Sequence, residues 1–528
     1  MLWWGMRLWV GGEYACGTVA LKMMWMVLLY VMLRLCLTGC SPKMLHVWTV
    51  LLLMGGMVEA LWGIGQMWNG TSRHAQYLLT GNLLNPGPYS AYLMIGAVAG
   101  MGMIENGKGN LSLTPTKGRI FSVLTTIIKG MTIVCLVVLP ATWSRAAWVG
   151  TGLLALWIYR QLYWKWRWWV WGGLVALGIL VFYVKQGSAE GRLIIWASAL
   201  TSWKRQPWLG VGIGGFNHAC AEGMASLYHQ DPWAFGAFRS AGVSEFSFNA
   251  LVQILVEQGV VGAMLCLTWV ALLLHRTSRL CQPLLGCMVA LLIFACFSYP
   301  FEMLPYNIIW VVSAALCAST PTEKEAKRTA PASHWGTAMA FGVMAILISL
   351  PLRTETLHRS ENAHDASLIT GMHDPYFLKD CWELLPTEQD EPTFLFNMAK
   401  MLEQKERWRD SNAILRMGTR VCSDPIFYIL MGNNYRKMEM NDLAEEAYCK
   451  AFAILPNRMY PLYQLMLLYR DNDQKDKAIR MAQRIHAMHP KIVSPATNEM
   501  QEEARKLLQE QEPVKEVSDR YPLLPILK

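Results

Sequence analysis

Long apolar runs alternate with short polar loops along the first two thirds of the chain. Runs of this length with few charges predict helices that cross a bilayer, because about 20 helical residues span its hydrocarbon core. We expect about ten such helices, in a range of roughly nine to twelve, and hence an all-α, polytopic transmembrane helical bundle. The expected spans are 15–37, 44–65, 88–104, 120–140, 146–162, 169–184, 249–274, 282–299, 304–319 and 335–352.

After residue 352 the apolar runs end and a charged, periodic sequence begins. Tyr435 and Tyr469 lie 34 residues apart, and so do Ala444 and Ala478. Small residues at a helix contact, with a proline closing each unit, resemble the tetratricopeptide helical hairpin. The alternative is an unrelated helical bundle with a chance period. We predict a soluble helical-repeat domain that binds a protein partner and supplies no chemistry.

These patterns divide the chain into five regions. The opening MLWWGMRLWV has no clear h-region or cleavage site, so we expect no cleaved signal peptide. The regions are N-terminal transmembrane helices at 1–74, a membrane core at 75–318, a linker at 319–334, a last transmembrane helix at 335–352 and helical repeats at 353–528.

Basic side chains gather in four short loops that alternate consistently along the chain. The positive-inside rule places such loops, the linker among them, in the cytoplasm. The long loop at 185–248 and the repeats are then expected in the periplasm, at the inner membrane of a bacterium. The basic residues are Lys108, Lys117 and Arg119, then Arg160, Lys165 and Arg167, then His275, Arg276 and Arg279, and finally Lys324, Lys327 and Arg328.

Composition agrees with a membrane protein, since 53% of the residues are hydrophobic and only 16% are charged. The net charge of +9 is spread over short loops and tail helices instead of forming one stripe, so we expect no nucleic-acid partner. The 13 cysteines have spacings that give neither a metal site nor a disulfide framework. We expect no metal and no cofactor.

The long loop carries several basic residues beside the expected lipid headgroups. A cationic surface at this depth suits an anionic, lipid-linked substrate. The glycine run at 210–215 permits tight turns, but it lacks the Lys and hydroxyl residue of a phosphate loop, so we interpret it as a shaped turn. The basic residues that we single out in this loop are Arg192, Lys204, Arg205 and Arg239.

Four segments, taken in order, resemble the O-antigen ligase family. They are GNLLNPGPYSAYL from Gly81, SRAAWVG from Ser144, GRLIIWASAL with QPWLGVGIGGF from Gly191, and FNALVQILVEQGVVG from Phe248. Members of that family are metal-independent membrane glycosyltransferases that transfer a glycan, with inversion, from undecaprenyl pyrophosphate to an acceptor such as lipid A core. The resemblance implies that activity here. O-antigen polymerases and protein O-oligosaccharyltransferases share these segments and remain alternatives.

The resemblance places Arg192 and Arg145 at the family's arginine positions. A planar guanidinium binds phosphate oxygens bidentately, which suits a leaving pyrophosphate without a metal. Lys204 and Arg205 are further candidates for binding the donor. The alternatives are a snorkelling anchor for Arg145, a loop arginine paired with Glu190 for Arg192, and headgroup contacts for the other two. The DxD string at 471–473 favours a solvated turn between repeat helices over a metal site.

One position departs from the family. The family has a His directly before the Asn that is Asn249 here, and this chain has Phe248, which cannot accept a proton. Glu245 is the nearest replacement for the catalytic base. His218, also a candidate for substrate binding, and His229 are others from the same loop. A dissociative transition state that needs little base is a second explanation. The third is a changed or lost activity, which leaves a catalytically silent membrane scaffold that recruits envelope proteins through its tail.

A polar stripe follows this position. Asn249, Gln253 and Glu257 are one helical turn apart and share a face of the expected helix. A polar stripe inside an apolar segment faces a cavity or a partner helix. We favour a substrate-binding cavity over a structural hydrogen-bond seam.

Overall fold

The computed structural model is helical, and the residues that it describes contain no strand, in agreement with the all-α class. The structure describes residues 17–37, 42–72, 74, 77–83, 85–107, 115–160, 164–169, 171–173, 186–230, 242, 244, 246–276, 282–320, 377–489 and 493–509.

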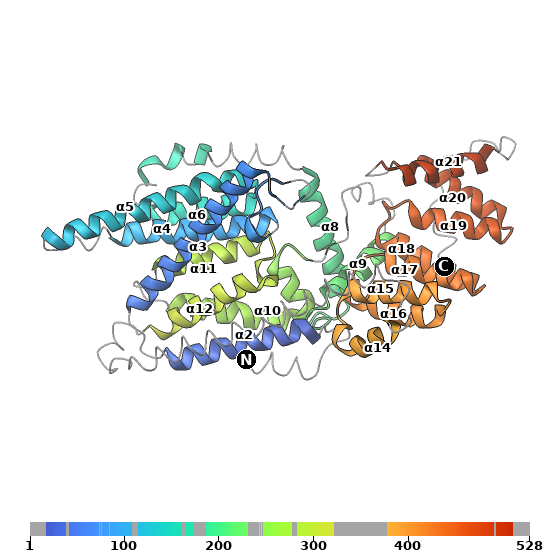
Figure 1. Ribbon diagram of the computed structural model, residues 1–528, viewed down its shortest axis with the longest axis horizontal. Coiled ribbons are helices and arrows are strands. Elements are labelled where there is room, and N and C mark those ends of the chain that lie inside the picture. Colours follow the sequence, from blue (N-terminus) through green and yellow to red (C-terminus); the bar gives the residue numbers. More distant parts are fainter. Residues whose placement is uncertain are drawn as a thin grey trace.

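Apolar helices form a bundle on one side of the molecule (Figure 1). Four of them, α2, α3, α5 and α10, are long and apolar enough to cross a membrane, while α6, α11 and α12 are shorter apolar helices. All lie at expected positions, whereas most of the expected span 169–184 and all of 335–352 lie outside the described residues. The bundle helices are α2 (Gly17–Cys36), α3 (Pro42–Asn69), α4 (Pro86–Gly107), α5 (Pro115–Val138), α6 (Arg145–Ile158), α10 (Ala250–Arg276), α11 (Gln282–Ala295) and α12 (Leu304–Ser319), with short turns η1 (Gly81–Leu83), η3 (Leu139–Thr142) and η6 (Pro300–Glu302).

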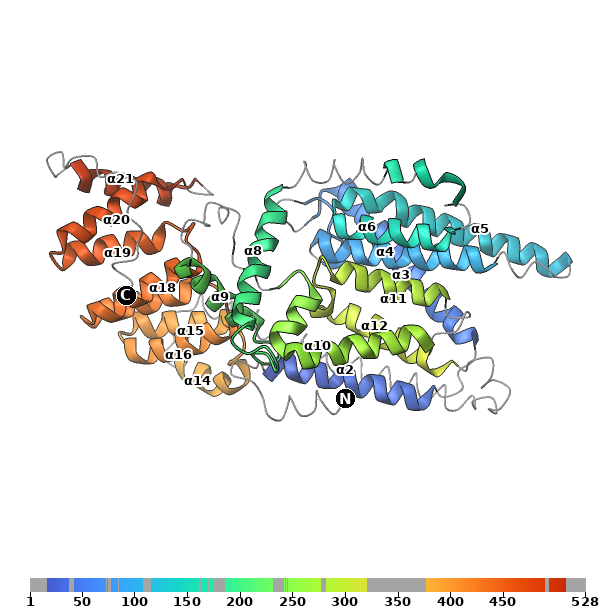
Figure 2. The same cartoon turned by 180° about the vertical axis from the view of Figure 1, so that it is seen from behind.

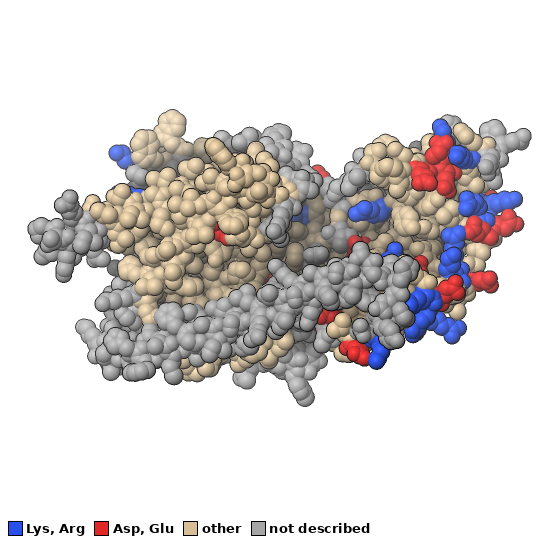
Figure 3. Space-filling model, viewed as in Figure 1, with Lys and Arg blue, Asp and Glu red and all other residues tan. Residues whose placement is uncertain are grey.

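Helix α4 lies in the centre of this bundle. It packs against α3, α5, α6 and α11, and Leu93, Met94 and Val98 on it are completely buried. The outer helices instead expose large apolar side chains such as Val58, Val137 and Met264. The described surface of the bundle is almost without charge in Figure 3, whereas Lys, Arg, Asp and Glu gather on the other end of the molecule. An apolar outer surface of this extent suits contact with lipid.

The long loop after α6 is folded, which the sequence did not indicate. It contains α8 (Gln186–Trp203) and α9 (Phe216–Gln230), which pack against each other between the bundle and the tail (Figures 1 and 2). Their contact is close because Gly223 has no side chain, and a Cβ there would lie 1.9 Å from the carbonyl oxygen of Ser198. Ser198 Oγ and Cys220 Sγ are 3.3 Å apart across the same contact.

The tail is a series of helical hairpins. Hairpins α15/α16, α17/α18 and α19/α20 begin at residues 392, 426 and 460, which are 34 residues apart. Each intervening turn holds one residue in the left-handed region, with φ of 59° at Glu406, 59° at Glu439 and 58° at Asp473. The predicted period is therefore present in the backbone, and the assignment to tetratricopeptide repeats stays a prediction. The tail helices are α14 (Phe377–Glu388), α15 (Pro392–Gln404), α16 (Trp408–Val421), α17 (Ile426–Lys437), α18 (Asn441–Ile454), α19 (Tyr460–Asp471), α20 (Lys475–Ala487) and α21 (Pro495–Gln509).

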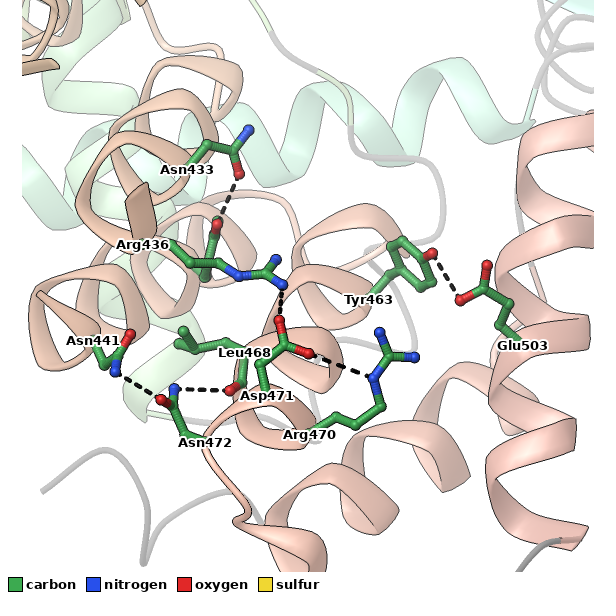
Figure 4. A network of polar contacts seen from close by, with 10 residues as sticks. Asn433, Arg436, Asn441, Tyr463, Leu468, Arg470, Asp471, Asn472 and Glu503 are labelled. Atoms are coloured by element: carbon green, nitrogen blue, oxygen red, sulfur yellow. Dashed lines mark hydrogen bonds and ion pairs between the residues drawn. The ribbon is translucent and has the colours of Figure 1, made fainter. Parts of the chain in front are cut away.

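The DxD string lies at one of these turns, at the end of α19. The Asp471 carboxylate pairs with Arg436 of α17, and Asn472 Oδ1 accepts a hydrogen bond of 2.7 Å from Asn441 of α18 (Figure 4). These two residues join neighbouring hairpins, so the string has a structural use in the repeat.

Helix α9 connects the folded loop to the tail. Its Glu222 carboxylate lies 2.7 Å from Lys450 Nζ of α18, and Tyr228 meets the Phe452 ring edge-on at 5.6 Å. Ser423 donates a hydrogen bond of 3.0 Å to the carbonyl of Ser244. Because these contacts join the two segments directly, the loop and the tail lie on the same side of the membrane.

Candidate functional site

Helix α10 is interrupted near its start, and a segment of the folded loop crosses the interruption. Gly259 has φ 67° and ψ −172°, which no helical residue adopts. The freed backbone groups are satisfied by the crossing segment. Val211 and Gly212 donate to the carbonyls of Val256 and Glu257 at 3.0 Å each. Unsatisfied backbone groups in a membrane segment are costly, so this crossing makes the break stable.

The crossing also explains why each of the two segments that meet there has a glycine at the point of contact. A Cβ on Gly259 would lie 2.2 Å from the carbonyl oxygen of Trp208, and one on Gly210 would lie 2.5 Å from the carbonyl oxygen of Val256. Both glycines also have positive φ, 67° and 69°. Only residues without a side chain fit there. The segments QPWLGVGIGGF and FNALVQILVEQGVVG therefore form one structural unit.

Glu257 holds the two segments of this unit together through hydrogen bonds. Its buried carboxylate accepts hydrogen bonds from the backbone N–H groups of Gly214 and Phe216, and one of 3.4 Å from Gln253 Nε2. Phe216 is the first residue of α9, so the carboxylate also lies at the positive end of that helix. The oxygens of Glu257 are thus used in positioning the loop.

The rest of the predicted polar stripe also contacts protein groups. Asn249 Oδ1 accepts from the N–H groups of Leu251 and Val252, at 3.0 and 3.2 Å, as an N-cap does at the start of α10. Gln253 donates from Nε2 to the Glu302 carboxylate of η6. All three members of the stripe therefore have hydrogen-bond partners within the protein.

Arg192 and Arg145 come together beside this unit. Arg192 is on α8, and Arg145 is the first residue of α6. Burial, and next the charge of Arg145, lower the pKa of Arg192, while Tyr299 acts in the opposite direction. Within the described part of the chain neither arginine forms an ion pair. Two partly buried guanidinium groups that have no ion pair among the described residues are chemically suited to binding an anion.

An aromatic cluster borders the arginines. The guanidinium carbon of Arg192 lies 5.1 Å from the centre of the Phe248 ring. Phe248 meets Tyr299 edge-on at 5.4 Å, and Phe246 stacks on Tyr299 at 4.3 Å. Asn85 Nδ2 donates to the Tyr299 hydroxyl at 3.0 Å. The segment that begins at Gly81 therefore meets the segment that begins at Phe248 through one tyrosine.

Comparison with known families adds a match over part of the chain. Residues 130–267 match the family model described as O-antigen ligase. The matched stretch includes both arginines, Phe248 and the break in α10. The chain contains an O-antigen ligase domain. No curated protein and no solved structure matches the chain.

The other basic candidates of the O-antigen ligase domain lie apart from the arginine pair. Lys204 is exposed just after the end of α8. Arg205 donates to Ser226 Oγ at 3.2 Å and lies 4.0 Å from the Glu222 carboxylate, both on α9. Arg192 and Lys204 are twelve positions apart, which corresponds to roughly 18 Å along a helix axis. Arg205 thus helps to hold α8 and α9 together.

The two candidate bases that the structure describes, His218 and His229, are not brought to the arginines either. His218 Nδ1 lies 2.7 Å from the carbonyl oxygen of Thr419, in the contact between α9 and the tail. His229 is exposed near the end of α9, where burial and the nearby Lys450 lower its pKa. Glu245 and Arg239 lie outside the described residues.

Three residues that meet this site were not singled out from the sequence. Tyr299, Glu302 and Asn85 lie in turns between apolar helices, and each bonds or packs against a residue of the 246–257 stretch or the aromatic cluster. In the sequence these residues are recognisable only as polar residues at the ends of apolar segments. Their connection with the site around Arg192 depends on the fold.

Proposed function

We propose that this protein transfers a glycan from undecaprenyl pyrophosphate to an acceptor hydroxyl, as an O-antigen ligase does. The observation that carries the proposal is the arginine pair inside the matched domain. The two guanidinium groups are placed to bind the pyrophosphate of the donor and to stabilise the negative charge that grows on it as it leaves.

In the proposed reaction the acceptor oxygen attacks the anomeric carbon from the face opposite the pyrophosphate. The bond from that carbon to the pyrophosphate oxygen breaks, and its electron pair stays on the pyrophosphate. The hydroxyl proton is lost late and passes to water. Such a path needs charge neutralisation more than it needs a base, and it is compatible with phenylalanine at position 248.

The acceptor is tested by offering three classes of hydroxyl compound to the purified protein with one donor. We expect transfer to lipid A core. Lengthening of the donor glycan instead would identify an O-antigen polymerase, and transfer to a protein would identify an O-oligosaccharyltransferase. Absence of transfer to all three would leave the silent scaffold, in which the tail recruits envelope proteins.

The proposed location is the bacterial inner membrane, with the folded loop and the tail in the periplasm. The direct contact of α9 with the tail supports a shared side for the two, and the basic short loops support the cytoplasm for the opposite side. Labelling of single cysteines from outside should reach positions 229 and 441 and should not reach 324. Labelling at 324 alone would contradict this orientation.

A further inference from the structure

Phe248 has a backbone conformation that is rare for its residue type. Its φ is 52°, in the left-handed region that bulky side chains seldom adopt. Hydrogen bonds on both sides fix the conformation. Trp196 Nε1 of α8 donates to the Ser247 carbonyl at 2.7 Å, and the backbone N–H of Asn249 donates to Ser247 Oγ at 3.1 Å. A strained residue persists where its surroundings impose it, and such residues gather at functional sites.

The imposed conformation brings the Phe248 ring to the guanidinium of Arg192. Arg192 and Trp196 are one turn apart on α8, so one face of this helix holds both the ring and the backbone before it. Tyr299 supports the ring from another direction, and Asn85 fixes the Tyr299 hydroxyl. Three separate elements, helix α8 and the turns that hold Tyr299 and Asn85, therefore determine where the ring lies.

The ring counters a repulsion within the site. Arg145 and Arg192 carry like charges, and their proximity disfavours the arrangement until an anion binds. The negative face of an aromatic ring attracts a guanidinium at this distance. An apolar aliphatic side chain would fill the same space without that attraction.

We propose that Phe248 is a positioning residue, whose ring holds the Arg192 guanidinium next to Arg145 in readiness for the donor pyrophosphate. This inference rests on the proposed function. It assigns to the ring a part in organising the anion site, at the position where the family has a histidine, and it requires no proton transfer by residue 248.

The test compares Phe248→Leu with Phe248→Tyr. Phe246→Leu is the matched control, because Phe246 stacks on Tyr299 and has no ring contact with Arg192. The assay uses a fluorescent undecaprenyl-pyrophosphate glycan in proteoliposomes and measures donor affinity, kcat, the KM of each substrate and the thermal midpoint. For Phe248→Leu we expect roughly tenfold weaker donor binding, an unchanged acceptor KM and an unchanged midpoint. Phe248→Tyr, which keeps a π face, should remain within about twofold of the wild type.

A second arm separates positioning from packing. In an Arg192→Ala background, adding Phe248→Leu should leave donor binding unchanged, because the group on which the ring acts is gone. A further roughly tenfold loss in that background would overturn the inference, since the ring would then act independently of Arg192. Equal losses in Phe246→Leu and Phe248→Leu, with lowered midpoints, would also overturn it by showing a packing role.

The failures of the two proposals are distinguishable. Normal transfer by both the wild type and Phe248→Leu overturns the positioning role and leaves the proposed function standing. A wild-type protein that neither binds the donor nor transfers its glycan overturns the proposed function, and the positioning role with it.

Discussion

Replacing Arg192 by alanine should remove most of the glycan transfer and little of the stability. The guanidinium is partly buried and has no ion pair among the described residues, so its main described contact is the Phe248 ring. Losing that contact costs about 1 kcal/mol of folding free energy at most, and relief of the repulsion from Arg145 offsets part of it. The protein should therefore fold and insert normally.

The effect on rate is much larger. A charge-assisted contact to an oxygen that gains charge in the transition state is worth about 3 kcal/mol, which corresponds to roughly a hundredfold in rate. Arg192→Lys should recover only a small part of it, because an ammonium group lacks the planar fork that binds two phosphate oxygens. A lysine that restored full activity would mean that charge alone is required.

The assay is transfer in proteoliposomes, with thermal unfolding in the same preparation. Arg167→Ala is the control, since Arg167 also lies over an aromatic ring, 5.5 Å from the centre of Trp168, but belongs to a segment that carries none of the site residues. We expect normal transfer by Arg167→Ala. Wild-type transfer by Arg192→Ala, or a loss of transfer that follows a loss of folded protein, would show that Arg192 does not stabilise the leaving pyrophosphate.

Two further predictions concern the framework of the site. Gly259→Ala should destabilise the protein by several kcal/mol and lower its thermal midpoint, because the new Cβ would lie 2.2 Å from the Trp208 carbonyl oxygen in a residue with φ 67°. Gly152→Ala is the control. Nothing lies within 4 Å of a Cβ at Gly152, so this variant should be neutral or stabilising. Equal midpoints for the two variants would contradict the crossing at α10. Glu222→Lys should weaken the contact between α9 and the tail by about 1 kcal/mol, which should appear as faster proteolysis of the tail. Adding Lys450→Glu to the same chain should restore the resistance to proteolysis, because the two charges are then exchanged. Failure of the double variant to recover would remove this ion pair from the interface.

The sequence predicts the helical bundle well because its signal is local. Apolar length alone places spans such as 304–319, which is the extent of α12. The 34-residue period of the tail is visible in the same way, because each hairpin repeats the same buried positions. Ala444 and Ala478 are buried in equivalent helices, as their spacing implies.

Features that depend on distant contacts were not predictable. Helices α8 and α9 find their apolar partners on α10 and in the tail, so their own sequence has no simple period that marks a helix. The break at Gly259 is hidden inside a continuous apolar run, and only the crossing of Pro207 to Gly212 reveals why a glycine is required.

The same distinction between local and distant contacts decides which features of the candidate site could be predicted from the sequence. The family resemblance predicted Arg192 and Arg145 as site residues, and the structure places them on different helices, close enough for the charge of Arg145 to lower the pKa of Arg192. Spacing also placed Asn249 and Glu257 on one face, but it could not show that Asn249 caps its own helix or that Glu257 caps α9. The contact of Tyr299 with the site depends on the packing of a turn that follows Arg192 by more than one hundred residues in the sequence.

Whether the arginine pair receives a leaving pyrophosphate can be measured on the products of a single turnover. Wild-type protein in proteoliposomes is given an undecaprenyl-pyrophosphate glycan and an acceptor, and both the released lipid and the new glycosidic bond are analysed in a single turnover. We expect one undecaprenyl pyrophosphate to be released per glycan transferred, with inverted configuration at the anomeric carbon. Release of the monophosphate, retention of configuration, or transfer that proceeds equally after both arginines are replaced by alanine would contradict it.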